Sequence, residues 1–310
     1  MLRLARNRTT GSLYTAAIVG LFDDDDDSDR EPASEAPPPA RPLTIPLAVL
    51  WFVVASSGAM FALLVTTSLR ESASHDLVNA VACQALAYAA SMAVMLRVHA
   101  PDRPLADAIG LRPTHWTFYL LAALFGIVLQ VPADWLEFLV TRVWPIPAAE
   151  LDDQLQLLRM ASPLQRVMVP LVTVCVGPAV EELFYRGVLQ SGLRRRYSGV
   201  VAVLLVAALF ATAHVTPQLL PAYLAIGLAL SGLRALSGSL LPSLIAHMFF
   251  NAVAIISLLL EGPSAQLESK PLPIDISVVG IGATLALSVI FVVIARRSER
   301  AQRARQEDAA

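Results

Sequence analysis

Three short groups of residues place acidic, imidazole and amide side chains inside apolar stretches of the sequence. Charged and imidazole groups at hydrocarbon depth are costly, so residues of this kind mark functional sites more often than the same residues on a water-exposed surface. Each group is therefore a candidate for chemistry. The groups are Glu181-Glu182-Leu183-Phe184-Tyr185-Arg186, Phe210-Ala211-Thr212-Ala213-His214 and His247-Met248-Phe249-Phe250-Asn251.

The first group separates two carboxylates by their positions on a helix. Glu182 and Arg186 are four residues apart, so they share a helical face and can pair, whereas Glu181 points about 100° away. One carboxylate is then held and the other is free. A free carboxylate in a desolvated pocket can act as a general base on water. Taken alone, the same residues fit a structural ion pair at a helix bend equally well.

The other two groups add imidazole and amide side chains from separate segments. His247 and Asn251 are also four apart, so both project from one face and can donate hydrogen bonds to a developing oxyanion. A single intramembrane histidine such as His214 is more often a link between helices than a catalyst. The coincidence of three groups favours the catalytic interpretation. Each lies about 18 to 22 Å from an end of its segment at about 1.5 Å per residue, so they can meet within the membrane.

The elements that carry these groups must be surrounded by lipid. Of 310 residues, 56% are hydrophobic and 15% charged, and the mean hydropathy is +0.61, outside the range of a soluble globular domain. This composition disfavours soluble α/β and all-β folds. The formal net charge of -2 gives no reason to expect a nucleic-acid partner.

We predict an all-α polytopic membrane protein with about eight transmembrane helices and an intramembrane active site. The third apolar run is the least regular, because Pro132, Asp134 and Glu137 interrupt it, and a very tight turn around Pro217 joins the fifth and sixth. The eight runs cover 43–67, 77–96, 115–140, 164–192, 199–215, 218–235, 239–260 and 275–295.

Tails and charge placement complete the predicted organisation. Residues 1–42 have too little apolar sequence to fold and are predicted to form a disordered cytoplasmic tail. The transmembrane domain is predicted over 43–297, and a basic cytoplasmic tail over 298–310. Arginines flank alternate runs on one side, which predicts that both termini are cytoplasmic. We expect a multi-pass protein of the cell membrane, and the use of arginine in place of lysine suggests a bacterial source.

The motifs Glu-Glu-x-x-x-Arg, Phe-x-x-x-His and His-x-x-x-Asn, in this order on successive apolar segments, resemble the signature of the CPBP intramembrane proteases. That family includes type II CAAX prenyl endopeptidases, bacterial Abi-type immunity and processing proteins, and proteins like lysostaphin resistance protein A. The resemblance covers about 160–260, a third of the chain. It implies an eight-helix protease whose active cavity opens to the cytoplasm.

The resemblance also implies a role for each residue of the three motifs, in the hydrolysis of a peptide bond by an activated water. The implied roles are a base at Glu181, support of that base by Glu182 and Arg186, proton transfer or ligation by His214, and stabilisation of the tetrahedral intermediate by His247 and Asn251.

The motif residues are compatible with a metal-dependent and with a metal-free mechanism. Members of this family are commonly called metalloproteases, yet the sequence has no His-Glu-x-x-His helix. Two histidines and a carboxylate, here His214, His247 and Glu181, could serve zinc or a metal-free glutamate mechanism. The pattern slightly disfavours an obligatory zinc ion.

Two other classes of function fit parts of the sequence. Buried carboxylates and histidines also form proton relays in transporters, although no inverted repeat links the two halves of the chain. A non-catalytic membrane scaffold or immunity protein could keep the motifs for packing.

As a protease, the chain would have two kinds of partner. They are membrane lipid and a membrane-associated protein or peptide, prenylated or bacteriocin-like. A bacterium need not contain prenylated proteins, so the family name does not transfer a substrate.

Overall fold

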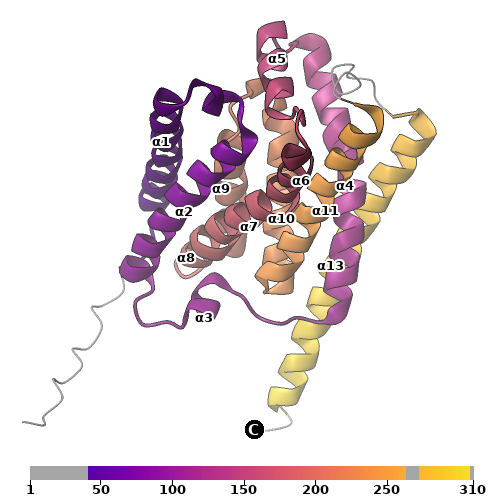
Figure 1. Cartoon of the computed structure of the whole chain (residues 1–310). Coiled ribbons are helices and arrows are strands. Elements are labelled where there is room, and N and C mark those ends of the chain that lie inside the picture. The colour runs from indigo at the N-terminus through magenta and orange to yellow at the C-terminus, as the bar shows by residue number, and fades with distance from the viewer. Residues whose placement is uncertain (1–40, 263–271, 308–310) are drawn as a thin grey trace, which may run out of the picture. The chain divides into compact units, whose positions relative to one another are not determined.

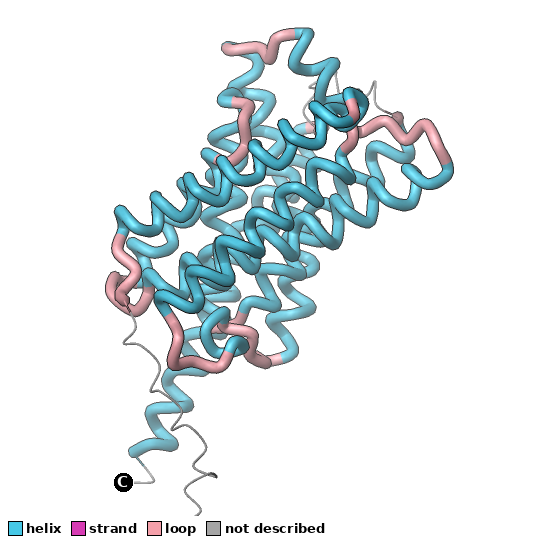
Figure 2. Tube along the Cα trace, turned by 60° about the vertical axis from the view of Figure 1, so that its left-hand side comes forward, coloured by secondary structure: helices cyan, strands magenta, loops and turns pink. Residues whose placement is uncertain are grey.

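The computed structural model describes residues 41–262 and 272–307, and this part of the chain is helical, without a strand. Seven helices in it are long and apolar enough to cross a membrane (Figures 1 and 2). The prediction of an all-α, multi-pass membrane protein is therefore confirmed. The predicted N-terminal tail lies outside the described residues, except for its last two positions. The seven helices are α1 (Ile45–Leu69), α2 (Leu77–His99), α4 (Trp116–Val143), the combined helix α6 to α8 (Pro163–Leu193), η5 with α10 (Pro217–Ser237), α11 (Leu240–Glu261) and α13 (Ile274–Glu307).

Polar residues at the expected positions begin several of these helices. Ser162 and Gln165 form a reciprocal capping box at the start of α6, and the hydroxyl of Ser239 caps α11. These side chains pair backbone N–H groups that have no partner within the helix. Gly238 ends α10 with φ of 67°, a left-handed conformation that glycine adopts without a steric cost.

The fifth predicted segment differs from the other seven. Residues 199–215 were expected to span the membrane, but α9 (Gly199–Thr212) has only 14 residues. At about 1.5 Å per residue it reaches about 21 Å, less than the hydrocarbon thickness of about 30 Å. The turn after α9, which contains His214, therefore lies at membrane depth. Such irregular backbone is tolerated where protein or a polar cavity surrounds it.

The third segment is more regular than the sequence indicated. The run predicted over 115–140, the least regular of the eight, is one span: α4 is continuous over 28 residues with Pro132 inside it. Proline has no N–H to donate to the carbonyl four residues earlier, here that of Val128. The hydroxyl of Thr284 on α13 lies 3.1 Å from that oxygen and donates to it. A neighbouring helix thus satisfies the carbonyl that proline leaves free, and α4 continues.

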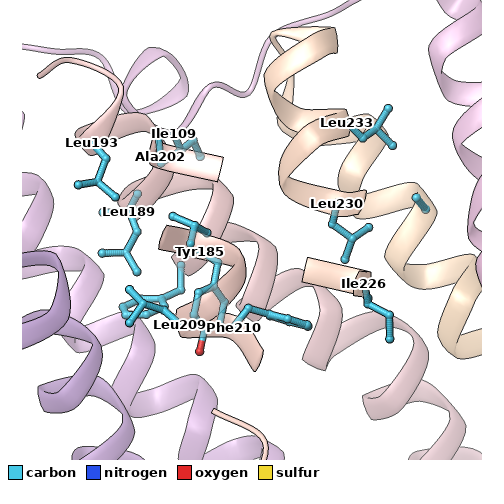
Figure 3. Close-up of a cluster of buried hydrophobic side chains, with 14 of the residues drawn as sticks. Ile109, Tyr185, Leu189, Leu193, Ala202, Leu209, Phe210, Ile226, Leu230 and Leu233 are labelled. Atoms are coloured by element: carbon cyan, nitrogen blue, oxygen red, sulfur yellow. The ribbon is translucent and has the colours of Figure 1, made fainter. Parts of the chain in front are cut away.

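The combined helix α6 to α8 lies at the centre of the bundle, and the α7 (Gly177–Glu182) and η4 (Leu183–Gln190) portions carry the first motif. It packs against α2, α9, α10 and α11 (Figure 1). Its buried side chains Tyr185, Leu189 and Leu193 share one apolar cluster with residues of α9 and α10 (Figure 3). The core therefore forms around the segment that carries both candidate catalytic carboxylates.

Two ends of the bundle carry different short helices. Helix α5 (Ala148–Leu157) lies at one end, and α3 (Leu105–Ile109) and α8 (Ser191–Leu193) lie at the other (Figure 1). Helix α13 continues to Glu307 at the α8 end, so the described part of the predicted tail over 298–310 is helical.

Two helices approach each other closely where α4 crosses α11. A Cβ atom added to Gly126 on α4 would lie 2.2 Å from the backbone oxygen of Ala246, the residue before His247. Only glycine allows this distance, and the contact fixes the position of α11 at the motif.

We therefore expect Gly126→Ala to force α4 and α11 apart and to lower the free energy of unfolding by about 1–3 kcal/mol, as overpacked sites do. Thermal unfolding of the detergent-purified protein measures this. Gly232→Ala on α10 is the matched control, because nothing lies within 4 Å of its added Cβ. Equal midpoint temperatures of unfolding for the two variants would contradict a tight contact at Gly126.

Candidate active site

A fully buried ion pair forms the centre of the site. Arg186 Nη1 donates to Glu182 Oε1 at 2.7 Å, and both side chains have no exposed surface. Arg186 also donates to the hydroxyl of Ser231 and to the carbonyl of Gly227, both on α10, at 3.3 Å each. Its guanidinium lies over the ring of Phe210 on α9, 4.5 Å from the centroid. The predicted pairing of residues four apart is thus confirmed, and it links three helices.

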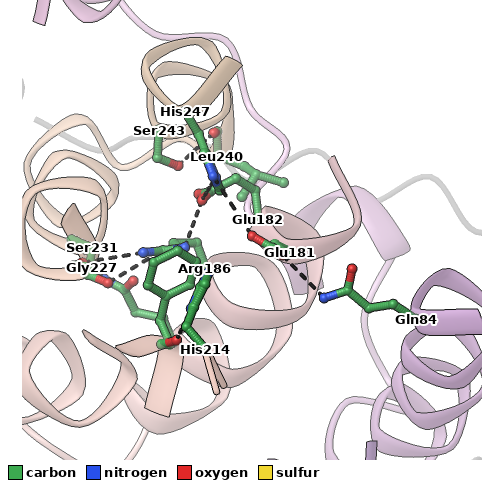
Figure 4. Close-up of polar contacts among 12 residues, drawn as sticks. Gln84, Glu181, Glu182, Arg186, His214, Gly227, Ser231, Leu240, Ser243 and His247 are labelled. Atoms are coloured by element: carbon green, nitrogen blue, oxygen red, sulfur yellow. Dashed lines mark hydrogen bonds and ion pairs between the residues drawn. The ribbon is translucent and has the colours of Figure 1, made fainter. Parts of the chain in front are cut away.

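His247 on α11 joins the two glutamates (Figure 4). Its Nδ1 lies 3.0 Å from Glu182 Oε1, and its Nε2 lies 3.8 Å from Glu181 Oε2. A carboxylate paired with arginine is an acceptor, so Nδ1 carries the hydrogen in this arrangement. Glu182 therefore orients the imidazole, and the second nitrogen faces Glu181 across a gap too long for a direct hydrogen bond.

Glu181 differs from its neighbour in burial and in partners. Its side chain is 17% exposed, against 0% for Glu182, and its Oε1 accepts a hydrogen bond from Gln84 Nε2 on α2 at 3.2 Å (Figure 4). Gln84 was not among the site residues predicted from the sequence. An amide inside the apolar run 77–96 was the available signal, because such groups bond between membrane helices.

Asn251 lies one turn beyond His247, and its amide bonds to an unusual stretch of backbone. Its Nδ2 donates to the Thr173 carbonyl at 2.9 Å, within the π-helical segment η3 (Val172–Val176). There the Gly177 N–H bonds the Val172 carbonyl, five residues earlier. The next donor in this pattern would be Pro178, which has no N–H. Asn251 thus satisfies a carbonyl that the helix cannot, and its amide nitrogen is directed there in this structure.

His214 lies beside the site rather than within its hydrogen-bond network. Its Nδ1 donates to the Phe210 carbonyl at 3.0 Å, and its ring stacks on Tyr223 with centroids 3.6 Å apart. Within the described part of the chain, no hydrogen bond joins His214 to Glu181 or His247.

An open cavity of about 610 Å³ borders His214 and Tyr223. Helix α5 contributes Glu150 and Asp153 to its wall, and the Thr216 hydroxyl fixes Glu150 with a hydrogen bond of 2.7 Å. The cavity therefore lies at the α5 end of the bundle, away from α3 and α8 (Figure 1). It supplies the polar surroundings that the turn after the short helix α9 requires at membrane depth.

The donor set does not match a bound metal as the side chains are placed. Among the described residues, no three His, Cys, Asp or Glu side chains are grouped so that they could hold a metal ion. Catalytic zinc takes three protein ligands around one point. Glu181 and His247 approach each other, but His214 is engaged with Phe210 and Tyr223. The three residues considered as ligands from the sequence therefore do not form a three-ligand site in this arrangement.

The arrangement combines an accessible carboxylate, an oriented imidazole and a buried pair that holds the imidazole. Such a set can take a proton from water and place a hydrogen-bond donor beside the same point. Four of the six candidate residues, Glu181, Glu182, Arg186 and His247, come together. Asn251 and His214 lie on either side of them.

Comparison with known proteins matches one part of the chain. Residues 163–253 match the family described as type II CAAX prenyl endopeptidase, Rce1-like. No curated protein and no solved structure matches the chain. The matched range contains all three motifs and excludes α1, α2 and α4.

We expect Arg186→Met to lower the free energy of unfolding by about 3–5 kcal/mol, because it leaves the buried Glu182 carboxylate without its cation. Chemical or thermal unfolding in detergent measures the loss. Arg112→Met is the control: its ion pair with Asp107 has the same kind of geometry, but its side chain is 56% exposed, so at most about 1 kcal/mol is expected. Similar losses in both variants would show that the buried pair has no special importance for stability.

Proposed function

Residues 163–253 match the Rce1-like type II CAAX prenyl endopeptidase family, and on the strength of this match we propose that the protein is a CAAX-type intramembrane protease with a specific activity. The protein hydrolyses a peptide bond of a membrane-associated protein or peptide, and Glu181 activates the water. The observation that carries the proposal is the facing pair of Glu181 Oε2 and His247 Nε2, 3.8 Å apart. A water lying to one side of the line between these atoms can contact both.

In the first step, the Glu181 carboxylate takes a proton from that water while the water oxygen bonds to the substrate carbonyl carbon. The carbonyl oxygen becomes an oxyanion. His247 lies beside it, and with both nitrogens protonated it donates from Nε2 to the oxyanion while Nδ1 stays bonded to Glu182. The buried Arg186 keeps Glu182 in place as the acceptor.

In the second step, the tetrahedral intermediate collapses and the carbon–nitrogen bond breaks. Glu181 returns its proton to the leaving nitrogen, which restores the carboxylate. Asn251 is the second oxyanion donor in this scheme, through the amide hydrogen that is not bonded to Thr173. His214 exchanges protons with water molecules in the cavity that it lines.

The substrate class follows from the surroundings of the site. The surrounding helices α1, α4 and α9 expose apolar side chains such as Leu64, Leu124 and Leu204, as surfaces in contact with lipid do. This lipid-facing surround supports our proposal that the substrate is held in or on the membrane. Prenylated proteins and bacteriocin-like peptides both meet this requirement.

Topology forms a separate part of the proposal. Arg194, Arg195 and Arg196 directly follow α8, and Arg103 and Arg112 flank α3, at the end opposite α5. By the positive-inside rule this end is cytoplasmic, together with both termini. The cavity beside His214 then opens to the other side of the membrane. The family resemblance implies a cytoplasmic opening, so the two expectations differ.

Cleavage of a fluorescence-quenched peptide library by detergent-purified protein tests the activity. Glu181→Gln should lower kcat about 10²–10⁴-fold, the usual contribution of a general base, with normal thermal unfolding. Glu71→Gln, in the exposed turn η2 (Glu71–His75), is the matched control and should cleave normally. We expect activity to persist with a zinc chelator. Full cleavage by a folded Glu181→Gln variant, or none by the wild type, would overturn the proposal.

Cysteine labelling in intact cells tests the topology. In a chain whose Cys83 and Cys175 are replaced, Asp153→Cys in the cavity wall should react with a membrane-impermeant maleimide added outside. Arg196→Cys at the other end should react only after permeabilisation. The reverse pattern would place the cavity on the cytoplasmic side, as the resemblance implies.

A further inference from the structure

We propose that Gln84 on α2 is a positioning residue for the general base, an inference that rests on the proposed function. The amide holds one oxygen of Glu181, so that the other oxygen faces His247. Gln84 lies outside residues 163–253, so the matched family segment does not contain it.

The two neighbouring glutamates are held in different ways. Glu182 has a cation and an imidazole on the same oxygen, Oε1. Among the described residues, no arginine or lysine pairs with Glu181, and the His247 imidazole lies 3.8 Å from its other oxygen. In the part of the chain that the structure describes, the one hydrogen bond to Glu181 comes from Gln84 Nε2, at 3.2 Å. The base that must be oriented most accurately thus depends on a donor from another helix.

An amide side chain at this position costs free energy unless it forms a hydrogen bond. Helix α2 is apolar enough to cross the membrane, and an amide without a partner in such a segment carries a desolvation penalty. Tyr88 lies one turn further along the same face, and its hydroxyl lies 3.1 Å from that of Tyr185 on the central helix. This second contact sets the register of α2 and keeps Gln84 opposite Glu181.

The hydrogen bond restricts a torsion that is otherwise soft. The terminal torsion of a glutamate is broad and nearly two-fold, so its carboxylate turns readily. With Oε1 held by Gln84, Oε2 is left 3.8 Å from His247 Nε2. Rotation away from this position would separate the base from the water that it must activate. A displacement of about 1 Å in a catalytic group can cost about 10²-fold in rate.

Steady-state kinetics of Gln84→Met test the inference, because methionine keeps the length of the side chain and removes the donor. We expect kcat to fall about 10- to 100-fold while KM changes less than about two-fold. Gln130→Met on α4 is the matched control. It removes the same kind of bond, from Gln130 Nε2 to Asp134 Oδ1 at 3.0 Å, which joins two residues of α4 and involves no motif residue, and should keep the wild-type kcat.

Three results would overturn the inference. They are wild-type kcat in Gln84→Met, an equal loss in Gln130→Met, and a rise in KM that accounts for the whole loss. Failure of the proposed function looks different, because then the wild type itself does not cleave. In that case infrared difference spectra still test the contact. The carboxylate stretching band that disappears in Glu181→Gln should shift in Gln84→Met and stay unchanged in Gln130→Met, and an unshifted band in Gln84→Met would also overturn the inference.

Discussion

The rest of the site depends on the contact between Glu182 and Arg186. Two opposite charges with no exposed surface are costly to remove from water, and their attraction offsets that cost only when other groups satisfy the remaining donors. Here Ser231 and Gly227 on α10 and the ring of Phe210 on α9 surround the guanidinium. The pair thus requires its neighbours, and in return it orients His247 and fixes three helices around Glu181.

Irregular backbone is a second common feature, and side chains from neighbouring helices complete it. Pro132 frees the carbonyl of Val128, which Thr284 on α13 bonds. In η3, the π-helical pattern and Pro178 free the carbonyl of Thr173, which Asn251 bonds. Lipid offers such groups no hydrogen-bond partner, and here side chains of other helices supply one. The prolines therefore act as points of attachment between helices.

Much of this arrangement could be predicted from local sequence. The pairing of Glu182 with Arg186 follows from a spacing of four residues, and the all-α membrane fold follows from the length of the apolar runs. The other features depend on contacts between distant segments. Nothing near Gln84 indicates that it will meet Glu181, 97 positions later. In the same way, nothing near Pro132 indicates that Thr284, 156 positions after Val128, will bond the Val128 carbonyl. The length of α9 was overestimated because the apolar run 199–215 continues into the turn that carries His214.

The shortness of α9 has a consequence for the lipid around it. Val200 and Leu204 expose apolar side chains on this helix, and its roughly 21 Å is about 9 Å less than the usual hydrocarbon thickness. A bilayer adapts to such a mismatch by becoming thinner beside the short element. A peptide approaching along α9 would then lose its hydrocarbon cover earlier than elsewhere around the bundle. The membrane would be thinnest next to His214, where an extended segment has the shortest distance to travel from lipid to water.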